Sequence, residues 1–414
     1  MNAITFFSLI LLSLTACHPV EPEPDLRQDE SISCSLLWKT ARSESHKDIL
    51  SKGGFVWDEY YIVTGENYVY HGEFSLTAYN KVTGEKAWYW RHPFKWQKGI
   101  DEFEIKGDIA VFSTVWGVYG FNLRSKRILW ELDFTRDKRV FGQSPIDIIG
   151  NYVYTSVNYG AFKSPDSLQL ERIHLENGER ETVYTFYKDD IWSPSVSKPV
   201  VYHNPETHES LLIIIRQDNH ENYGPQESPT HLLAIDLRSR KLVWERKKFC
   251  EVGTQLGHSP VIYGKNVLVM GDWSAYCFEA ESGEFFWRKP FNHLKPYGSF
   301  SNTQSLLHED RFYINPGAPD IFCLNPEDGN ILWHNPKDAP NCEAYMQIQK
   351  GMLIYTSWGL GSIMILDAET GKLLHREMPS DGSAFHVDVS YDSQTDTYFT
   401  CSYKDAYAFK IEKK

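Results

Sequence analysis

The stretch CLNPEDGNILW, residues 323–333, recurs along the chain, and this recurrence decides the fold. Further clear copies are AYNKVTGEKAW (78–88), AIDLRSRKLVW (234–244), CFEAESGEFFW (277–287) and ILDAETGKLLH (365–375). GFNLRSKRILW (120–130) follows the same frame, RIHLENGERET (172–182) keeps it loosely, and AFKIEKK (408–414) is a truncated copy. Self-similarity of this period predicts a propeller, a solenoid or another array, so the repeat has to be interpreted before any single residue.

One polar position aligns all eight copies. It is occupied by Asn80, Asn122, His174, Asp236, Glu279, Asn325, Asp367 and Lys410, at intervals of 42, 52, 62, 43, 46, 42 and 43 residues. The residue before it is large and apolar in every copy, and the residue before that is small in six of the eight. Because adjacent side chains of a strand point to opposite faces, both faces are specified, as in sheets that stack on both sides. An interval of about 40–45 residues fits one four-stranded propeller blade.

Two more positions are fixed relative to this polar residue. Four residues later most copies carry a glycine, which allows the positive φ of a tight hairpin turn. These glycines are Gly84, Gly178, Gly283, Gly329 and Gly371, and Lys126 and Arg240 replace them in two copies. Eight residues later stand Trp88, Trp130, Trp244, Trp287 and Trp333, while Thr182 and His375 take this position in the two copies that lack the tryptophan. Each unit is therefore predicted to be four short strands joined by tight turns.

The last copy stops too early to hold its final strand and tryptophan. The missing piece, LLWKT, occurs alone at residues 36–40 and carries Trp38. An N-terminal strand that completes the C-terminal blade would close the ring and remove exposed sheet edges. We therefore predict eight blades, the eighth formed by residues 394–414 together with 35–41. Seven blades would require one copy to be discarded, most readily the degenerate copy around His174.

The phrase closely resembles the repeat of the quinoprotein (PQQ-like) propellers, A-x-D-x-x-T-G-x-x-x-W. The resemblance covers roughly residues 35–414 and implies an all-β fold, an eight-bladed β-propeller of four-stranded antiparallel blades. It also implies that the recurring tryptophan packs between neighbouring blades, and burial of such a ring stabilises by up to about 4–6 kcal/mol. The tryptophans expected to pack in this way are Trp38, Trp88, Trp130, Trp244, Trp287 and Trp333.

The N-terminus is typical of an exported protein. Ile4–Leu14 is an apolar run that is too short to span a bilayer and suits the core of a signal peptide. It ends in Leu-Thr-Ala-Cys17, which resembles a lipoprotein signal that is cleaved before Cys17 and lipidated there. A plain secretory signal is the alternative, since no Lys or Arg precedes the apolar core.

These observations give three segments: a signal peptide at 1–16, a lipidated Cys17 with a disordered tether at 17–33, and a propeller at 34–414. The tether prediction rests on its proline and acidic residues and on the lack of an apolar run. By resemblance to lipoprotein sorting rules, His18 after the cysteine favours the outer membrane.

The formal net charge of −13 excludes a nucleic-acid partner, because such binding needs a basic face.

Six cysteines remain besides Cys17, and none belongs to a Cys-x-x-Cys motif. Zinc and c-type haem therefore have no support from the sequence pattern. Cys277 and Cys323 take the small position of the repeat, where they are expected to fill space. Cys34 and Cys401 both fall in the composite eighth blade, so a disulfide between them stays open.

The resemblance raises the hypothesis of a quinone-dependent dehydrogenase, which would hold the quinone and a calcium ion at the propeller centre. Many such enzymes carry two consecutive cysteines against the cofactor, and this chain has no Cys-Cys pair. No spaced set of acidic residues indicates calcium, and the histidines form no catalytic motif. We therefore predict no catalytic residue, no cofactor and no metal, and the protein is not expected to be an enzyme.

What remains is a binding surface. The turns between the second and third strands of the blades fall on one face of a propeller, and Trp116, Trp273 and Trp358 lie on or beside such turns. Tryptophan is a favoured anchor of protein interfaces, so these three residues are candidate partner-binding residues. The alternative is that their rings pack against neighbouring turns.

Architecture therefore indicates a non-enzymatic scaffold that binds a protein in the cell envelope. A lipoprotein signal, a tether and eight such repeats resemble the BamB family of outer-membrane lipoproteins, which implies work in outer-membrane protein assembly. A surface lipoprotein that binds carbohydrate or another extracellular ligand is the alternative. The identity of the partner and the side of the membrane on which the protein lies stay open.

Overall fold

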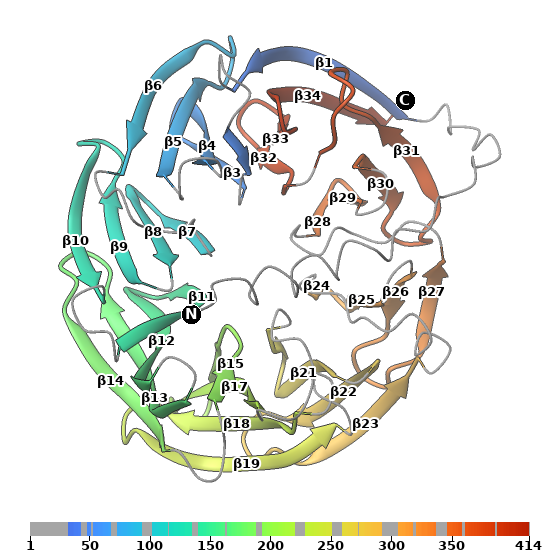
Figure 1. Cartoon of the computed structure of the whole chain (residues 1–414). Helices are drawn as coiled ribbons and strands as arrows, with labels where there is room; N and C mark the ends of the chain where they lie inside the picture. The colour runs from blue at the N-terminus through green and yellow to red at the C-terminus, as the bar shows by residue number, and fades with distance from the viewer. Residues whose placement is uncertain are drawn as a thin grey trace, which may run out of the picture.

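The computed structural model describes residues 32–42, 48–50, 53–67, 73–92, 102–114, 116–134, 140–161, 164–187, 193–219, 228–250, 259–271, 273–291, 305–317, 320–336, 346–357, 361–385 and 387–413. These residues form strands arranged as a closed ring of eight antiparallel sheets around a central axis (Figure 1). The prediction of an eight-bladed all-β propeller is confirmed. No helix in the described part is long and apolar enough to cross a membrane.

The first four blades follow the order of the chain. Blade 1 contains β2 (Asp48–Leu50), β3 (Gly54–Trp57), β4 (Tyr60–Asn67), β5 (Glu73–Asn80) and β6 (Lys86–Arg91). Blade 2 contains β7 (Glu102–Lys106), β8 (Ile109–Thr114), β9 (Gly117–Asn122) and β10 (Arg127–Asp133). Blade 3 contains β11 (Val140–Ile149), β12 (Tyr152–Ala161), β13 (Ser164–His174) and β14 (Arg180–Tyr187). Blade 4 contains β15 (Ser193–Val196), β16 (Val200–His203), β17 (Ser210–Asn219), β18 (Thr230–Asp236) and β19 (Lys241–Cys250).

The other four blades complete the ring. Blade 5 contains β20 (Val261–Tyr263), β21 (Asn266–Gly271), β22 (Ser274–Glu279) and β23 (Phe285–Pro290). Blade 6 contains β24 (Leu306–His308), β25 (Arg311–Gly317), β26 (Asp320–Leu324) and β27 (Ile331–Asn335). Blade 7 contains β28 (Gln347–Gln349), β29 (Met352–Thr356), β30 (Ile363–Asp367) and β31 (Leu373–Glu377). Blade 8 contains β32 (Ser390–Asp392), β33 (Thr397–Cys401), β34 (Asp405–Lys413) and β1 (Ile32–Ala41).

Blade 8 joins the two ends of the chain. β1 pairs with β34 in an antiparallel ladder that runs from Ile32↔Lys413 to Ala41↔Asp405 (Figure 1). The predicted closure by the N-terminal strand is therefore confirmed. The strand begins at Ile32, two residues before the propeller boundary expected from the sequence, because Ile32 is itself buried in the core between blades 7 and 8.

The degenerate repeat around His174 is a full blade. β12, β13 and β14 form consecutive antiparallel pairs, and β11 completes the sheet at the inner edge. The alternative of seven blades is therefore wrong. The repeat spacing at this blade is long because its strands are long. β13 spans Ser164–His174, whereas the equivalent strand of blade 6, β26, spans Asp320–Leu324.

The core lies between the blades. Most of the described buried apolar residues fall into eight clusters, and each cluster joins two neighbouring blades. Between blades 6 and 7, for example, Tyr313 and Cys323 pack with Leu353 and Leu366. The alternation of bulky and small side chains read from the repeat therefore corresponds to the two faces of each sheet.

The repeated tryptophan and glycine belong to one contact. The ring of Trp333 lies against Gly371 of the next blade, whose φ is +71°, and a Cβ on that glycine would lie 2.4 Å from Cε3 of the ring. The Trp333 indole nitrogen also donates a hydrogen bond to the Ala368 carbonyl, at 3.1 Å. The same ring-on-glycine contact and indole hydrogen bond to the next blade occur at Trp38, Trp130, Trp244 and Trp287.

The copies that lack the glycine keep the turn and change the contact. Lys126 and Arg240 adopt φ of 56° and 57°, so the turn needs the positive φ even without glycine. The ammonium of Lys126 lies 5.5 Å from the centroid of the Trp88 ring, which is a cation–π contact. All six tryptophans expected to pack between blades thus lie at or near a blade interface.

Candidate functional site

The turns between the second and third strands, together with the connections from one blade to the next, lie on one face of the ring, here called the crossover face. Its described turns include Thr114–Gly117 without residue 115, Ser357–Ser362 without residues 358–360, and Cys401–Asp405. The hairpin turns that carry the repeat glycines lie on the opposite face, because successive strands run in opposite directions. The crossover face is therefore the surface that can vary without disturbing the contacts between tryptophan and glycine.

Trp116 lies on this face, as predicted. Its amide donates a hydrogen bond to Thr114 Oγ1 at 3.0 Å, and its carbonyl accepts one from the Phe134 amide at 2.7 Å. These bonds fix the turn between β8 and β9 against the end of β10. The residue is half-buried.

Trp273 requires a correction. It lies on the expected turn, with φ of 58°, but only 7% of it is exposed and its ring joins the core between blades 5 and 6. The Phe291 amide donates to the Trp273 carbonyl at 2.7 Å, which holds the turn against the end of β23. Trp273 therefore packs against its neighbours and is not an exposed anchor. The third candidate, Trp358, lies outside the described residues, as does Cys17.

Two aromatic residues on the crossover face were not singled out from the sequence. Tyr187 ends β14 and is 75% exposed, and Tyr403 lies in the turn between β33 and β34 and is 38% exposed. Met378 follows β31 on the same face and is also exposed. Each follows or separates strands at a point where no repeat position is defined, so the repeat pattern could not mark them. With Trp116, they give this face an exposed aromatic character that suits a protein partner.

A buried charged cluster lies near the same face, between blades 3 and 4. The guanidinium of Arg216 lies 2.8 Å from Asp218 Oδ1 and stacks over the Phe186 ring of blade 3. His231 Nε2 lies 3.0 Å from Asp218 Oδ2, and its Nδ1 lies 3.4 Å from Glu245 Oε1. Burial acts to raise the pKa of Asp218, but the His231 hydrogen bond and the Arg216 charge outweigh it and lower that pKa. The Arg216 guanidinium thus lies beside both carboxylates, and these contacts join β17, β18 and β19 of blade 4.

β7, β11 and β15 lie at the inner edges of their blades (Figure 1). A second polar cluster is formed by residues of β7, of β11 and of the segment between β15 and β16. Lys198, between β15 and β16, places its Nζ 3.0 Å from Glu102 Oε2 and 2.9 Å from Glu104 Oε1 on β7. Asp147 on β11 lies in the same region, where burial, with a contribution from the Glu104 charge, raises its pKa to about 6. Lys198 thus links blade 4 to blade 2 across the inner edge of blade 3.

These inner residues do not fit the quinone and calcium ion that the repeat family implies. Calcium takes about six to eight oxygen ligands, whereas here the ammonium of Lys198 already contacts both glutamate carboxylates. The pair of consecutive cysteines found against the quinone in many such enzymes is absent from the sequence.

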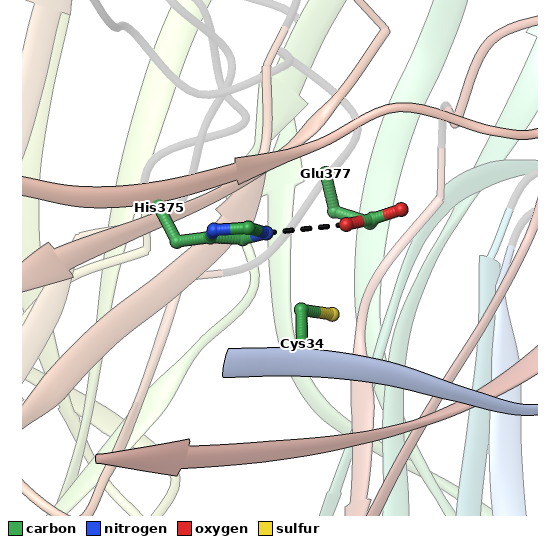
Figure 2. Close-up of side chains that lie close together, drawn as sticks. All are labelled: Cys34, His375 and Glu377. Carbon is green, nitrogen blue, oxygen red and sulfur yellow. Dashed lines mark hydrogen bonds and ion pairs between the residues drawn. The ribbon is translucent and has the colours of Figure 1, made fainter. Parts of the chain in front are cut away.

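A third cluster could hold a metal ion. Cys34, His375 and Glu377 place one ligand atom each within 4.8 Å of one another, on strands β1 and β31 (Figure 2). His375 Nε2 lies 3.1 Å from Glu377 Oε2. Burial, with a contribution from the nearby Glu377 carboxylate, raises the pKa of the Cys34 thiol well above its ordinary value. No metal-ligand spacing in the sequence marks this cluster, because the cysteine and the histidine come from opposite ends of the chain.

The structure shows no disulfide between Cys34 and Cys401. No disulfide joins any two of the described cysteines, Cys34, Cys250, Cys277, Cys323 and Cys401, and Cys342 lies outside the described residues. Cys34 pairs with Ile411 and Cys401 pairs with Ala406, so the two cysteines of blade 8 lie at different ends of the sheet. Cys277 and Cys323 are fully buried in interblade clusters, where they fill space as expected.

Comparisons with known proteins bear out the resemblance found in the repeat. The family model described as outer membrane protein assembly factor BamB matches residues 295–395. BamB from Moraxella catarrhalis matches with 12% identity and a TM-score of 0.58, over 91% of this chain and 100% of that one. A search of curated protein sequences found no match.

Enzymes share the same fold. A europium-containing methanol dehydrogenase matches with 11% identity and a TM-score of 0.61, over 89% of this chain and 84% of that one. A quinohemoprotein alcohol dehydrogenase from Pseudomonas putida matches with 10% identity and a TM-score of 0.59, over 92% of this chain and 76% of that one. At these identities the matches establish the propeller fold alone, since one fold hosts many functions.

Proposed function

We propose that this protein is a non-enzymatic, lipid-anchored scaffold that binds a protein partner in the cell envelope and takes part in outer-membrane protein assembly. The observation that carries the proposal is the extent of the match to BamB, which takes in 100% of that chain and 91% of this one. The dehydrogenases contain additional sequence beyond the shared ring, since 84% and 76% of their chains are covered. The family-model match to residues 295–395 supports the same choice.

The inner cluster supports a role without quinone chemistry. At the axis, where the related enzymes hold their cofactor, Lys198 bridges Glu102 and Glu104 and joins blades 2 and 4. Such a bridge suits a rigid ring whose outer surfaces are used for binding. The crossover face, with Trp116, Tyr187 and Tyr403, is the surface on which we place the partner.

The proposal is tested in the native cell. Deleting the gene is expected to lower the amount of folded outer-membrane proteins, and the wild-type gene is expected to restore it. The double variant Trp116→Ala, Tyr187→Ala is expected to fold normally and to fail in complementation, because truncated interface anchors cost about 2 kcal/mol or more each. The measurement is quantitative proteomics of outer-membrane fractions.

Tyr89→Ala is the matched control. Tyr89 is 50% exposed but lies within β6, on the outer rim of blade 1 and away from the crossover face. This variant is expected to complement as well as the wild type. Normal levels of folded outer-membrane proteins in the deletion strain would contradict the assembly role. Full complementation by the double variant would instead move the binding surface away from these residues.

Membrane attachment is predicted to depend on Cys17. Cys17→Ser removes the thiol that the lipoprotein signal prepares for lipidation, so the variant is expected to leave the membrane fraction and become soluble. Fractionation of cells followed by immunoblotting measures the change. Unaltered membrane association of the variant would rule out the lipid anchor and favour the plain secretory signal.

A further inference from the structure

The contact between blades 7 and 8 differs from the other interfaces. β34 and β1, the last two strands of blade 8, come from opposite ends of the chain, so no turn joins them and no repeat glycine is present. On the blade 7 side, His375 takes the position that a tryptophan occupies in six other blades. The tryptophan and the glycine are thus both missing at the seam where the ring is closed.

A different set of side chains fills this place. Cys34 lies on β1 opposite Ile411, which is the residue directly after the aligned polar position of its repeat. At five other interfaces, the tryptophan indole donates a hydrogen bond to a backbone carbonyl of the next blade. The acceptor is in each case the residue directly after the aligned polar position. Cys34 therefore faces His375 at the level where the tryptophan contact would otherwise be made (Figure 2).

The geometry points to a zinc site formed by Cys34 Sγ, the His375 imidazole and the Glu377 carboxylate; we propose that Zn²⁺ binds there and fastens the N-terminal strand to blade 7. Cysteine, histidine and glutamate are the three side chains that zinc prefers, at bond lengths of about 2.0–2.3 Å. Tetrahedral coordination at those lengths sets ligand atoms about 3.3–3.8 Å apart. The present atoms lie within 4.8 Å of one another, so small side-chain rotations suffice.

The surroundings suit a metal with one open position. His375 is nearly buried, with 11% of its side chain exposed, whereas Glu377 is 30% exposed and Cys34 is half-buried. The site is thus held on its inner side by protein and can be reached by water on its outer side, as in three-ligand zinc sites. A thiolate and a carboxylate together neutralise the charge of the ion. Binding would release the thiol proton to solvent.

The test uses the full chain purified in detergent, stripped of metal with a chelator and then titrated with Zn²⁺ in competition with a chromogenic chelator. We expect one zinc per chain and a melting temperature that rises until one equivalent is added. Cobalt(II) in place of zinc should give a thiolate-to-metal absorption band and the strong visible bands of tetrahedral cobalt. This spectrum reports coordination independently of stability.

Two variants test the proposed ligands, and a third is the control. Cys34→Ser is expected to abolish the thiolate band and weaken zinc binding about a hundredfold. Glu377→Gln, which keeps the shape of the side chain, should weaken it about tenfold and keep the thiolate band. His203→Ala removes an exposed histidine of blade 4 and is the matched control for adventitious binding. It should change neither the zinc affinity nor the thiolate band.

Two outcomes would overturn the proposal. One is the absence of stoichiometric zinc binding by the folded wild-type chain, which would leave the three side chains as a hydrogen-bonded cluster. The other is zinc binding that persists unchanged in Cys34→Ser, which would place the metal on other residues. If Cys34→Ser folds poorly, Glu377→Gln, which keeps the shape of the side chain, takes its place in the test. Zinc binding weakened about tenfold then supports the proposal, and unchanged zinc binding contradicts it.

Discussion

Deletion of β1, residues 32–41, is expected to remove most of the stability of the propeller. This strand supplies one whole edge of blade 8 and carries Trp38, whose ring packs with Tyr79 and Phe399 between blades 8 and 1. Loss of a buried tryptophan side chain alone costs about 3–5 kcal/mol, against a total of about 5–15 kcal/mol for a typical domain. The deletion also opens the ring and leaves β34 as an unpaired edge that invites aggregation.

Deletion of residues 18–31 is the matched control, because it removes a longer segment that precedes the first strand. This truncation is expected to melt within about 2 °C of the wild type, since surface changes usually alter stability by no more than about 0.5 kcal/mol. Thermal unfolding followed by circular dichroism compares the two proteins. Equal melting temperatures for both truncations would mean that β1 does not close the ring in solution.

Replacing Trp333 with alanine is expected to cost about 3–5 kcal/mol, the usual range for loss of a large buried aromatic side chain. The ring is buried between blades 6 and 7, and its indole nitrogen bonds to the Ala368 carbonyl. Leu332→Ala, on the adjacent and 46% exposed residue, is the control and should change stability by no more than about 0.5 kcal/mol. Urea denaturation measures both values.

A double-mutant cycle tests whether this tryptophan acts through the glycine of the next blade. Gly371→Ala should destabilise the protein strongly, because φ is +71° and the new Cβ would lie 2.4 Å from the Trp333 ring. In the Trp333→Ala background the clash is gone, so the same substitution should cost less, with a coupling of about 0.5–3 kcal/mol. Additive effects would show that the two residues contribute independently.

The interface between blades 3 and 4 shows how the repeat can change without loss of the blade. Thr182 stands there in place of the tryptophan, and Arg240 in place of the glycine. Arg240 donates a hydrogen bond to the Thr182 carbonyl at 3.1 Å and pairs with Glu181, which also binds Arg172 at 2.7 Å. Both weak positions noted in the sequence thus belong to one substituted contact, which the sequence by itself could not reveal.

The sequence by itself determined the number of blades and the closure of the ring, but it placed the eighth blade at 394–414 with 35–41 and so missed the inner strand β32 at Ser390–Asp392. It could do so because the repeat encodes short-range geometry: the alternation of strand faces, the positive φ of a turn and the large ring that fills an interblade space. These features recur at fixed distances along the chain, and even the separated strand with Trp38 kept enough of the pattern to be assigned to blade 8. The repeat also located the turns that carry Trp116 and Trp273.

Only the tertiary structure decided which side chains are accessible and which distant groups meet. Trp273 stands on a turn, like Trp116, yet its ring folds into the core between two blades, because side-chain direction depends on neighbours that the pattern does not encode. Cys34 and His375 are brought together because the ring closes on its first strand. The local repeat thus fixes the scaffold, while contacts across blades and across the seam create the sites that can differ from one propeller to the next.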